Sequence, residues 1–118
     1  MILAILDDLM FTSKIRAAAQ QSGVTVVFAR SAQSALEQMR SVTPALAIFD
    51  LNNPRTDPIG TITAMKADAA LATIPTVGYV SHVDAATIAS ARAAGADQVV
   101  ARSAFVTQLP DILARAGT

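Results

Sequence analysis

The chain has 118 residues, a length that suits one domain with a substantial hydrophobic core. Its nine basic and nine acidic residues cancel, and it has no cysteine and one histidine, which excludes a nucleic-acid-binding charge pattern, a disulfide framework and a cluster of histidine ligands. Although 53% of the residues are hydrophobic, no apolar run approaches the roughly 18 residues of a membrane helix. We therefore expect a single cytoplasmic domain over residues 1–118, with no nucleic-acid partner, no membrane segment and no attached output domain.

Short apolar runs alternate with helix-like patterns five times along the chain. Because these runs do not alternate between polar and apolar residues, they predict strands that are buried on both faces. The predicted strands are residues 2–6, 24–29, 45–49, 76–80 and 98–101. Strict alternation of strands and helices predicts an α/β fold, a doubly wound (βα)5 sandwich with a parallel sheet between two layers of helices.

The segments between the strands have helical spacing and recognisable ends. Gly23 stands where the first helix would end, and Ser31 and Asp84 stand where the second and fourth helices would begin as N-caps. Pro110 interrupts the last helix-like segment, and proline fits a helix best in its first turn. We therefore expect the last helix to begin near Thr107.

Acidic residues stand where two of the predicted strands end. Asp7 and Asp8 follow the first strand, and Asp50 follows the third. Ligands bind at the carboxyl ends of parallel strands, and carboxylates brought together there repel one another unless a cation compensates. The pattern predicts a site for a hard cation and phosphate chemistry. The alternative is that these aspartates cap helices or solubilise loops.

Four short motifs are spread in order over nearly the whole chain. They are ILAILDD at residues 2–8, LAIFDLNNP at 46–54, IPTV at 74–77 and ARAAGAD at 91–97. In this order and spacing the motifs resemble those of the response-regulator receiver domains of two-component signalling. The resemblance implies a flavodoxin-like fold with strand order 2-1-3-4-5, in which the first and third strands are neighbours.

The resemblance also implies a role for each polar residue at the strand ends. Asp50 takes the place of the phosphoryl acceptor, and Asp7 and Asp8 take that of the acidic pair that helps to hold Mg²⁺, for which Mn²⁺ can substitute. Asn52 stands where the family supplies a backbone carbonyl to the metal. The implied partners are a histidine kinase or phosphotransfer protein and a downstream protein. The implied protein is a monomer or weak homodimer and is not an enzyme.

The end of the fifth strand departs from the family pattern. Arg102 replaces a lysine, and this replacement is not conservative, because a guanidinium group is planar and bulkier than an ammonium group. Arg102 is expected to contact the phosphoryl group, to pair with Asp50 or to face solvent. Ser103 replaces a proline, so the cis peptide bond of the family is not expected.

The residues that would report phosphorylation also differ from the family pattern. Ser81 is our candidate for the hydroxyl that contacts the phosphoryl group, although a count from Pro75 without gaps places Val80 there. His82 is expected to be a loop residue. Val99 stands where the family has an aromatic residue that changes rotamer.

The favoured function is that of a stand-alone receiver domain in a two-component or phosphorelay pathway, which accepts a phosphoryl group on Asp50 with Mg²⁺ and signals through protein–protein contacts. The alternative is a pseudo-receiver, which has the same fold but is not phosphorylated and acts as a protein-interaction module. A small flavodoxin-like enzyme or nucleotide-binding protein would need a glycine-rich phosphate loop after the first strand, and none follows Asp8.

Overall fold

The computed structural model describes residues 1–81 and 84–117. Within these residues the strands are β1 (Ile2–Ile5), β2 (Val26–Ala29), β3 (Leu46–Asp50), β4 (Thr76–Val80) and β5 (Gln98–Ala101). The helices are α1 (Leu9–Ser22), α2 (Ala32–Val42), α3 (Pro58–Ala67), α4 (Ala85–Ala94) and α5 (Arg102–Gly117), with a short 3-10 helix, η1 (Pro54–Thr56). The predicted strands are confirmed, with ends that differ by at most two residues.

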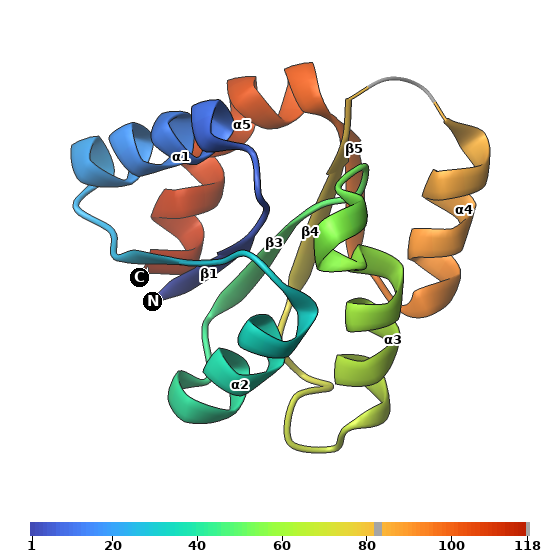
Figure 1. Cartoon of the computed structure of the whole chain (residues 1–118). Coiled ribbons are helices and arrows are strands. Elements are labelled where there is room, and N and C mark those ends of the chain that lie inside the picture. The colour runs from blue at the N-terminus through green and yellow to red at the C-terminus, as the bar shows by residue number, and fades with distance from the viewer. Residues whose placement is uncertain (82–83, 118) are drawn as a thin grey trace.

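The strands form one parallel sheet in the order β2-β1-β3-β4-β5, which confirms the flavodoxin-like (βα)5 fold. Figure 1 shows α1 and α5 on one face of the sheet and α2, α3 and α4 on the other. In the register of β1 with β3, Ile5 lies opposite Phe49. The segments that follow these two strands therefore leave the sheet side by side, at the same edge.

The core consists of two clusters of buried side chains, one on each face of the sheet. Side chains of β1 alternate between them: Ile2 and Ala4 belong to the cluster under α1 and α5, and Leu3 and Ile5 belong to the cluster under α2, α3 and α4. All four residues are fully buried. Burial on both faces is the property that the unbroken apolar runs predict.

The helix ends follow the predicted capping residues. Ser31 Oγ accepts a hydrogen bond from the backbone N–H of Ser34 at 3.1 Å, and Asp84 Oδ1 accepts one from that of Thr87 at 3.2 Å. Gly23 ends α1 with a φ of 68°, in the left-handed region that favours glycine. These three predicted helix ends are confirmed.

The predicted start of the last helix is wrong. α5 begins at Arg102 rather than near Thr107, so Pro110 lies in its interior. The proline is exposed, while Phe105 and Leu109 are buried against the sheet. Burial of the earlier turn therefore outweighs the backbone hydrogen bond that proline cannot make. In Figure 1 the orange and red parts of α5 run in different directions, as expected of a helix with an interior proline.

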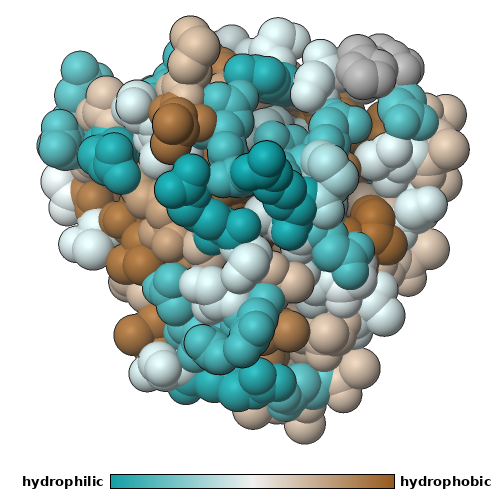
Figure 2. All heavy atoms as spheres, viewed as in Figure 1, coloured by the Kyte–Doolittle hydropathy of each residue, from teal (hydrophilic) through white to brown (hydrophobic). Residues whose placement is uncertain are grey.

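None of the helices among residues 1–81 and 84–117 has the length and hydrophobicity needed to cross a membrane. Figure 2 shows hydrophobic residues scattered among hydrophilic ones on the face that it displays. The large hydrophobic side chains that are exposed include those of Leu9, Met10 and Val42.

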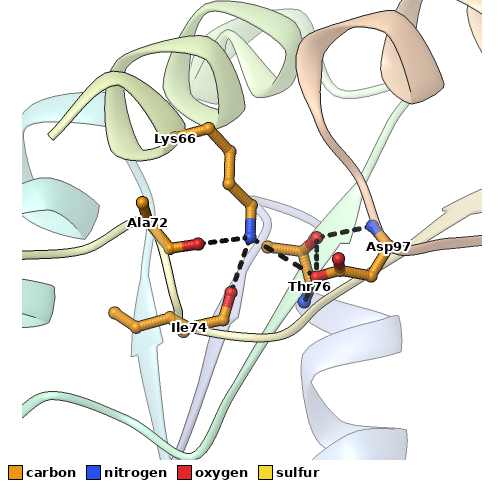
Figure 3. A network of polar contacts seen from close by, with 5 residues as sticks. All are labelled: Lys66, Ala72, Ile74, Thr76 and Asp97. Atoms are coloured by element: carbon orange, nitrogen blue, oxygen red, sulfur yellow. Dashed lines mark hydrogen bonds and ion pairs between the residues drawn. The ribbon is translucent and has the colours of Figure 1, made fainter. Parts of the chain in front are cut away.

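A polar network around Lys66 closes the end of the sheet where β4 and β5 begin (Figure 3). Lys66 Nζ, on α3, donates hydrogen bonds to the carbonyl oxygens of Ala72 at 3.1 Å and Ile74 at 2.9 Å, and lies 3.4 Å from Asp97 Oδ2. The same Asp97 oxygen accepts hydrogen bonds from the backbone N–H of Thr76 at 2.8 Å and from its hydroxyl at 3.1 Å. The network therefore fixes the connection from α3 to β4 and joins the starts of two strands.

Replacement of Lys66 by Met keeps a long unbranched side chain and removes the donor for two carbonyl groups. We expect the free energy of unfolding to fall by about 1–3 kcal/mol, because partly buried acceptors lose their partner. Urea unfolding followed by circular dichroism measures the loss. The matched control, Lys14→Met at an exposed position of α1, should lose less than about 0.5 kcal/mol. Equal losses in both variants would contradict the role given to Lys66.

The pKa of Asp97 gives a second prediction. Burial by itself would raise this pKa, but the hydrogen bonds from Thr76 and the charge of Lys66 outweigh it and hold the pKa below its usual value. The ionised carboxylate therefore adds stability above the unfolded-state pKa, near 4, and this stability is lost as the pH falls through the lower folded-state pKa. We expect Asp97→Asn to be less stable than the parent at neutral pH, and the difference to shrink below about pH 4. Urea unfolding over a pH series tests this, and a difference that stays constant into acid would contradict it.

Candidate functional site at the carboxyl ends of the strands

Asp50 is the last residue of β3 and is half-buried. Its Oδ1 accepts a hydrogen bond from the backbone N–H of Asn52 at 3.0 Å, while Oδ2 accepts none from the described residues. Burial raises the pKa of this carboxyl group, and the Asn52 hydrogen bond and the charge of Arg102 oppose the rise. The site therefore holds one carboxylate oxygen in place and leaves the other available to react.

Asp7 lies between β1 and α1, and two arginines hold its carboxylate. Its Oδ1 is 3.0 Å from Nε of Arg30, and its Oδ2 is 2.9 Å from Nη1 of Arg55. The hydrogen bond from Arg30 is the main cause that holds the pKa of Asp7 below its usual value; the smaller effect of burial opposes it, and Arg55 adds to it. Both oxygens of Asp7 are thus engaged by guanidinium groups that come from two other loops.

Asp8 caps α1 at its N-terminus. Its Oδ1 accepts hydrogen bonds from the backbone N–H groups of Met10 at 3.0 Å and Phe11 at 3.1 Å, and its Oδ2 lies 3.8 Å from Nη2 of Arg102. The capping alternative for the strand-end aspartates is therefore confirmed for Asp8. The same side chain satisfies two helix-end donors and also lies beside a cation.

Arg102 begins α5 and pairs with Asp8. Its guanidinium carbon lies 4.5 Å from the centroid of the Phe11 ring, in a cation–π contact. Among the described residues Arg102 forms no ion pair with Asp50, although its charge still acts on that carboxyl group. The predicted ion pair with Asp50 is therefore replaced by one with Asp8, and contact of Arg102 with a phosphoryl group stays a prediction.

Ser81 follows β4 and joins it to the loop after β3. Its backbone N–H donates to Oδ1 of Asn52 at 2.7 Å, and its side chain is exposed. Val80 is buried in the core on the side of α3 and α4. The loop position of Ser81 agrees with its choice over Val80, and its contact with a phosphoryl group stays a prediction. His82 lies outside the described residues.

The side chains of this site do not fit a metal ion as they are arranged here. Among the described residues, no group of three or more Asp, Glu or His side chains is placed to hold one. Mg²⁺ needs open carboxylate oxygens, whereas Asp7 has both oxygens on arginines and Asp8 has one on the helix end. The assignment of Asp7, Asp8, Asp50 and Asn52 as metal ligands stays a prediction.

The sequence reasoning missed Arg30 and Arg55. Arg30 immediately follows β2, and Arg55 lies in η1 just after β3, so both occupy the same edge of the sheet as Asp7. Their positions after predicted strands were a signal for this placement. Periodicity cannot show which acidic group a long side chain will reach.

A comparison with models of protein families shows to which family the chain belongs. The family model of the response regulator receiver domain matches residues 2–114. The chain belongs to this family. The match confirms the resemblance of the four motifs and places the chain among the receiver domains of two-component signalling. A search of curated proteins found no match.

Solved response regulators share the fold of this receiver domain. One from Hahella chejuensis has a TM-score of 0.87 and 22% identity, covering 99% of this chain and 94% of that one. The phosphorylated cyanobacterial phytochrome response regulator RcpA has a TM-score of 0.80 and 24% identity, covering 97% and 88%. The Mn²⁺-bound form of response regulator Rcp1 has a TM-score of 0.79 and 15% identity, covering 94% and 89%.

An aromatic cluster lies beneath the acidic site of the receiver domain. Tyr79 of β4 stacks against Phe105 with ring centroids 4.8 Å apart, and its centroid lies 4.8 Å from that of Phe11. The Tyr79 ring is buried, and its hydroxyl has no hydrogen-bond partner among the described residues. Burial, with the negative charge of Asp50, raises the pKa of Tyr79 far above its usual value.

Tyr79→Phe removes the buried hydroxyl and keeps the stacked ring. Because the hydroxyl has no partner among the described residues, we expect the free energy of unfolding to stay the same or to rise by up to about 1 kcal/mol. Tyr79 is the only tyrosine, and the chain has no tryptophan, so the ultraviolet absorbance of tyrosinate reports on it alone. The folded parent should show no tyrosine ionisation near pH 10. Ionisation there without unfolding would show that the hydroxyl reaches solvent, and a clear loss of stability in the variant would show that the hydroxyl has a hydrogen-bond partner.

Proposed function

We propose that this receiver domain accepts a phosphoryl group on Asp50 in a two-component or phosphorelay pathway, and that it signals by protein–protein contact rather than as an enzyme. The supporting observation is the half-buried Asp50 carboxylate at the end of β3, with Oδ1 on the Asn52 N–H and Oδ2 available. Attack of Oδ2 on the phosphorus atom of a donor forms an acyl phosphate and releases the leaving group of the donor.

Arg102 supplies positive charge to this site. Its charge acts on Asp50 across the site, and guanidinium groups bind phosphate oxygens well. One similar structure is a phosphorylated response regulator and another is a Mn²⁺-bound one, which supports both chemistries for this family. For Mg²⁺ or Mn²⁺ to bind at Asp7 in this chain, Asp7 has to leave its two arginines.

The proposed phosphoryl donor is a cytoplasmic histidine kinase or a phosphotransfer protein, and the proposed output is contact with a downstream protein by a monomer or weak homodimer. Leu9 and Met10 follow Asp8 at the start of α1, and 67% and 83% of their surfaces are exposed. These apolar side chains give a protein donor a surface to contact beside the acidic site.

A pseudo-receiver is the second candidate function, and two observations favour it. Arg30 and Arg55 engage both oxygens of Asp7. The half-buried Val99 of β5 has no ring to move between buried and exposed positions. In this alternative the domain binds its partner without phosphorylation.

Intact-mass measurement separates the two functions. After incubation with acetyl phosphate and Mg²⁺, the parent should gain the mass of one phosphoryl group, and Asp50→Asn should gain none. Asp68→Asn, which changes an aspartate at the far end of α3, is the matched control and should gain mass like the parent. A parent chain that gains no mass would reject phosphorylation by this donor and favour the pseudo-receiver.

A further inference from the structure

We propose that Arg30 and Arg55 form an arginine lock, by which we mean the two ion pairs that close over Asp7. The lock occupies the carboxylate oxygens that a divalent cation would need, so a cation binds only by displacing the arginines. The inference concerns the same acidic site as the proposed function, but it does not require Asp50 to be phosphorylated.

Each carboxylate oxygen of Asp7 is bound by a different arginine. Nε of Arg30 lies 3.0 Å from Oδ1, and Nη1 of Arg55 lies 2.9 Å from Oδ2, so each oxygen has its own charged donor. The Asp7 side chain is 12% exposed, whereas those of Arg30 and Arg55 are 63% and 79% exposed. The carboxylate therefore has little exposed surface with both arginines in place, while the arginines themselves extend into solvent.

Three arginines balance the charge of the three aspartates at this end of the sheet. Asp7, Asp8 and Asp50 are accompanied by the guanidinium groups of Arg30, Arg55 and Arg102, of which the first two pair with Asp7 and the third with Asp8. Close carboxylates need a compensating cation, and here the protein supplies three positive charges of its own. Because arginine stays protonated at every physiological pH, this compensation is permanent.

Arg30 and Arg55 come from two different segments of the chain. Arg30 lies 23 residues after Asp7, directly behind β2, and Arg55 lies 48 residues after it, in η1 behind β3. The lock therefore ties the loops that follow β1, β2 and β3 to one another. Displacement of the arginines would remove this link between the three loops, while the hydrogen bond from Ser81 to Asn52 would still hold the start of the loop after β3.

Removal of the lock tests the proposal. The variant Arg30→Met/Arg55→Met keeps long side chains without the guanidinium groups, and both sites are mostly exposed, so the chain should still fold. Electron paramagnetic resonance of free Mn²⁺ measures the dissociation constant in the full chain. We expect at least about tenfold tighter binding than in the parent, with part of the gain in each single variant. Asp50→Asn in the double variant should reverse the gain.

The matched control is Arg40→Met/Arg92→Met, which removes the same charge from exposed positions in the last turns of α2 and α4, at the opposite ends of these helices from the acidic site. Its Mn²⁺ affinity should equal that of the parent. Equal affinity in the parent, the control and the lock variant would overturn the proposal, as would an equal gain in the control and the lock variant. Should the double variant fail to fold, the two single variants decide by the same comparison.

A second measurement tests whether the metal ion displaces the arginine from Asp7, or whether the arginine weakens metal binding only through its positive charge. In the parent, the Arg30 Nε–H proton is hydrogen-bonded to Asp7, so its nuclear magnetic resonance signal should be protected from solvent exchange. Saturating Mg²⁺ should abolish this protection, because the cation and the guanidinium compete for one carboxylate. Protection that survives saturation would show that metal binds without opening the lock. Neither result depends on phosphoryl transfer, so failure of Asp50 to be phosphorylated leaves the proposal standing.

Discussion

The complete burial of β1 is the constraint on which the site depends. Its four residues have no exposed surface, and hydrogen bonds to β2 and β3 hold it between these two strands. A one-residue slip would turn its buried side chains to the opposite faces, so the register is strongly fixed. As a result Asp7, Asp8 and Asp50 emerge at one edge of the sheet, where the charge of Asp8 helps to raise the pKa of Asp50 and arginines pair with Asp7 and Asp8.

At both ends of the sheet, long cationic side chains bind polar groups that are partly buried. At the carboxyl end, Arg30 and Arg55 reach Asp7, and Arg102 reaches Asp8. At the amino end, Lys66 crosses to two carbonyl groups and to an aspartate. Each cation forms an ion pair with an aspartate far along the chain, so these ion pairs add tertiary order that local sequence does not encode.

This distinction explains how much of the molecule was predictable from its sequence. The strands, the helix caps and the position of Asp50 at the end of β3 depend on local patterns, namely apolar runs and the residues at their ends, and these predictions were confirmed. The role of Asp50 as phosphoryl acceptor stays a prediction. The helix start near Thr107 failed because a local rule about Pro110 was outweighed by burial of Phe105. The partners of Asp7 escaped prediction because they depend on which loops the fold brings within the reach of an arginine.

Asp8 shows why the presence of the acidic pair is weak evidence that a receiver domain still transfers phosphoryl groups. The side chain caps α1 through two backbone N–H groups, so its loss would weaken a helix whether or not a metal ever binds. Selection for a stable fold would retain Asp8 in a lineage that had abandoned phosphoryl transfer. In such a lineage, substitutions would appear first where the side chain does least for the fold. Asp50 accepts one backbone hydrogen bond, from Asn52, whereas Asp8 accepts two at the end of a helix, so substitutions at Asp50 are a better marker of lost signalling chemistry than the persistence of Asp8.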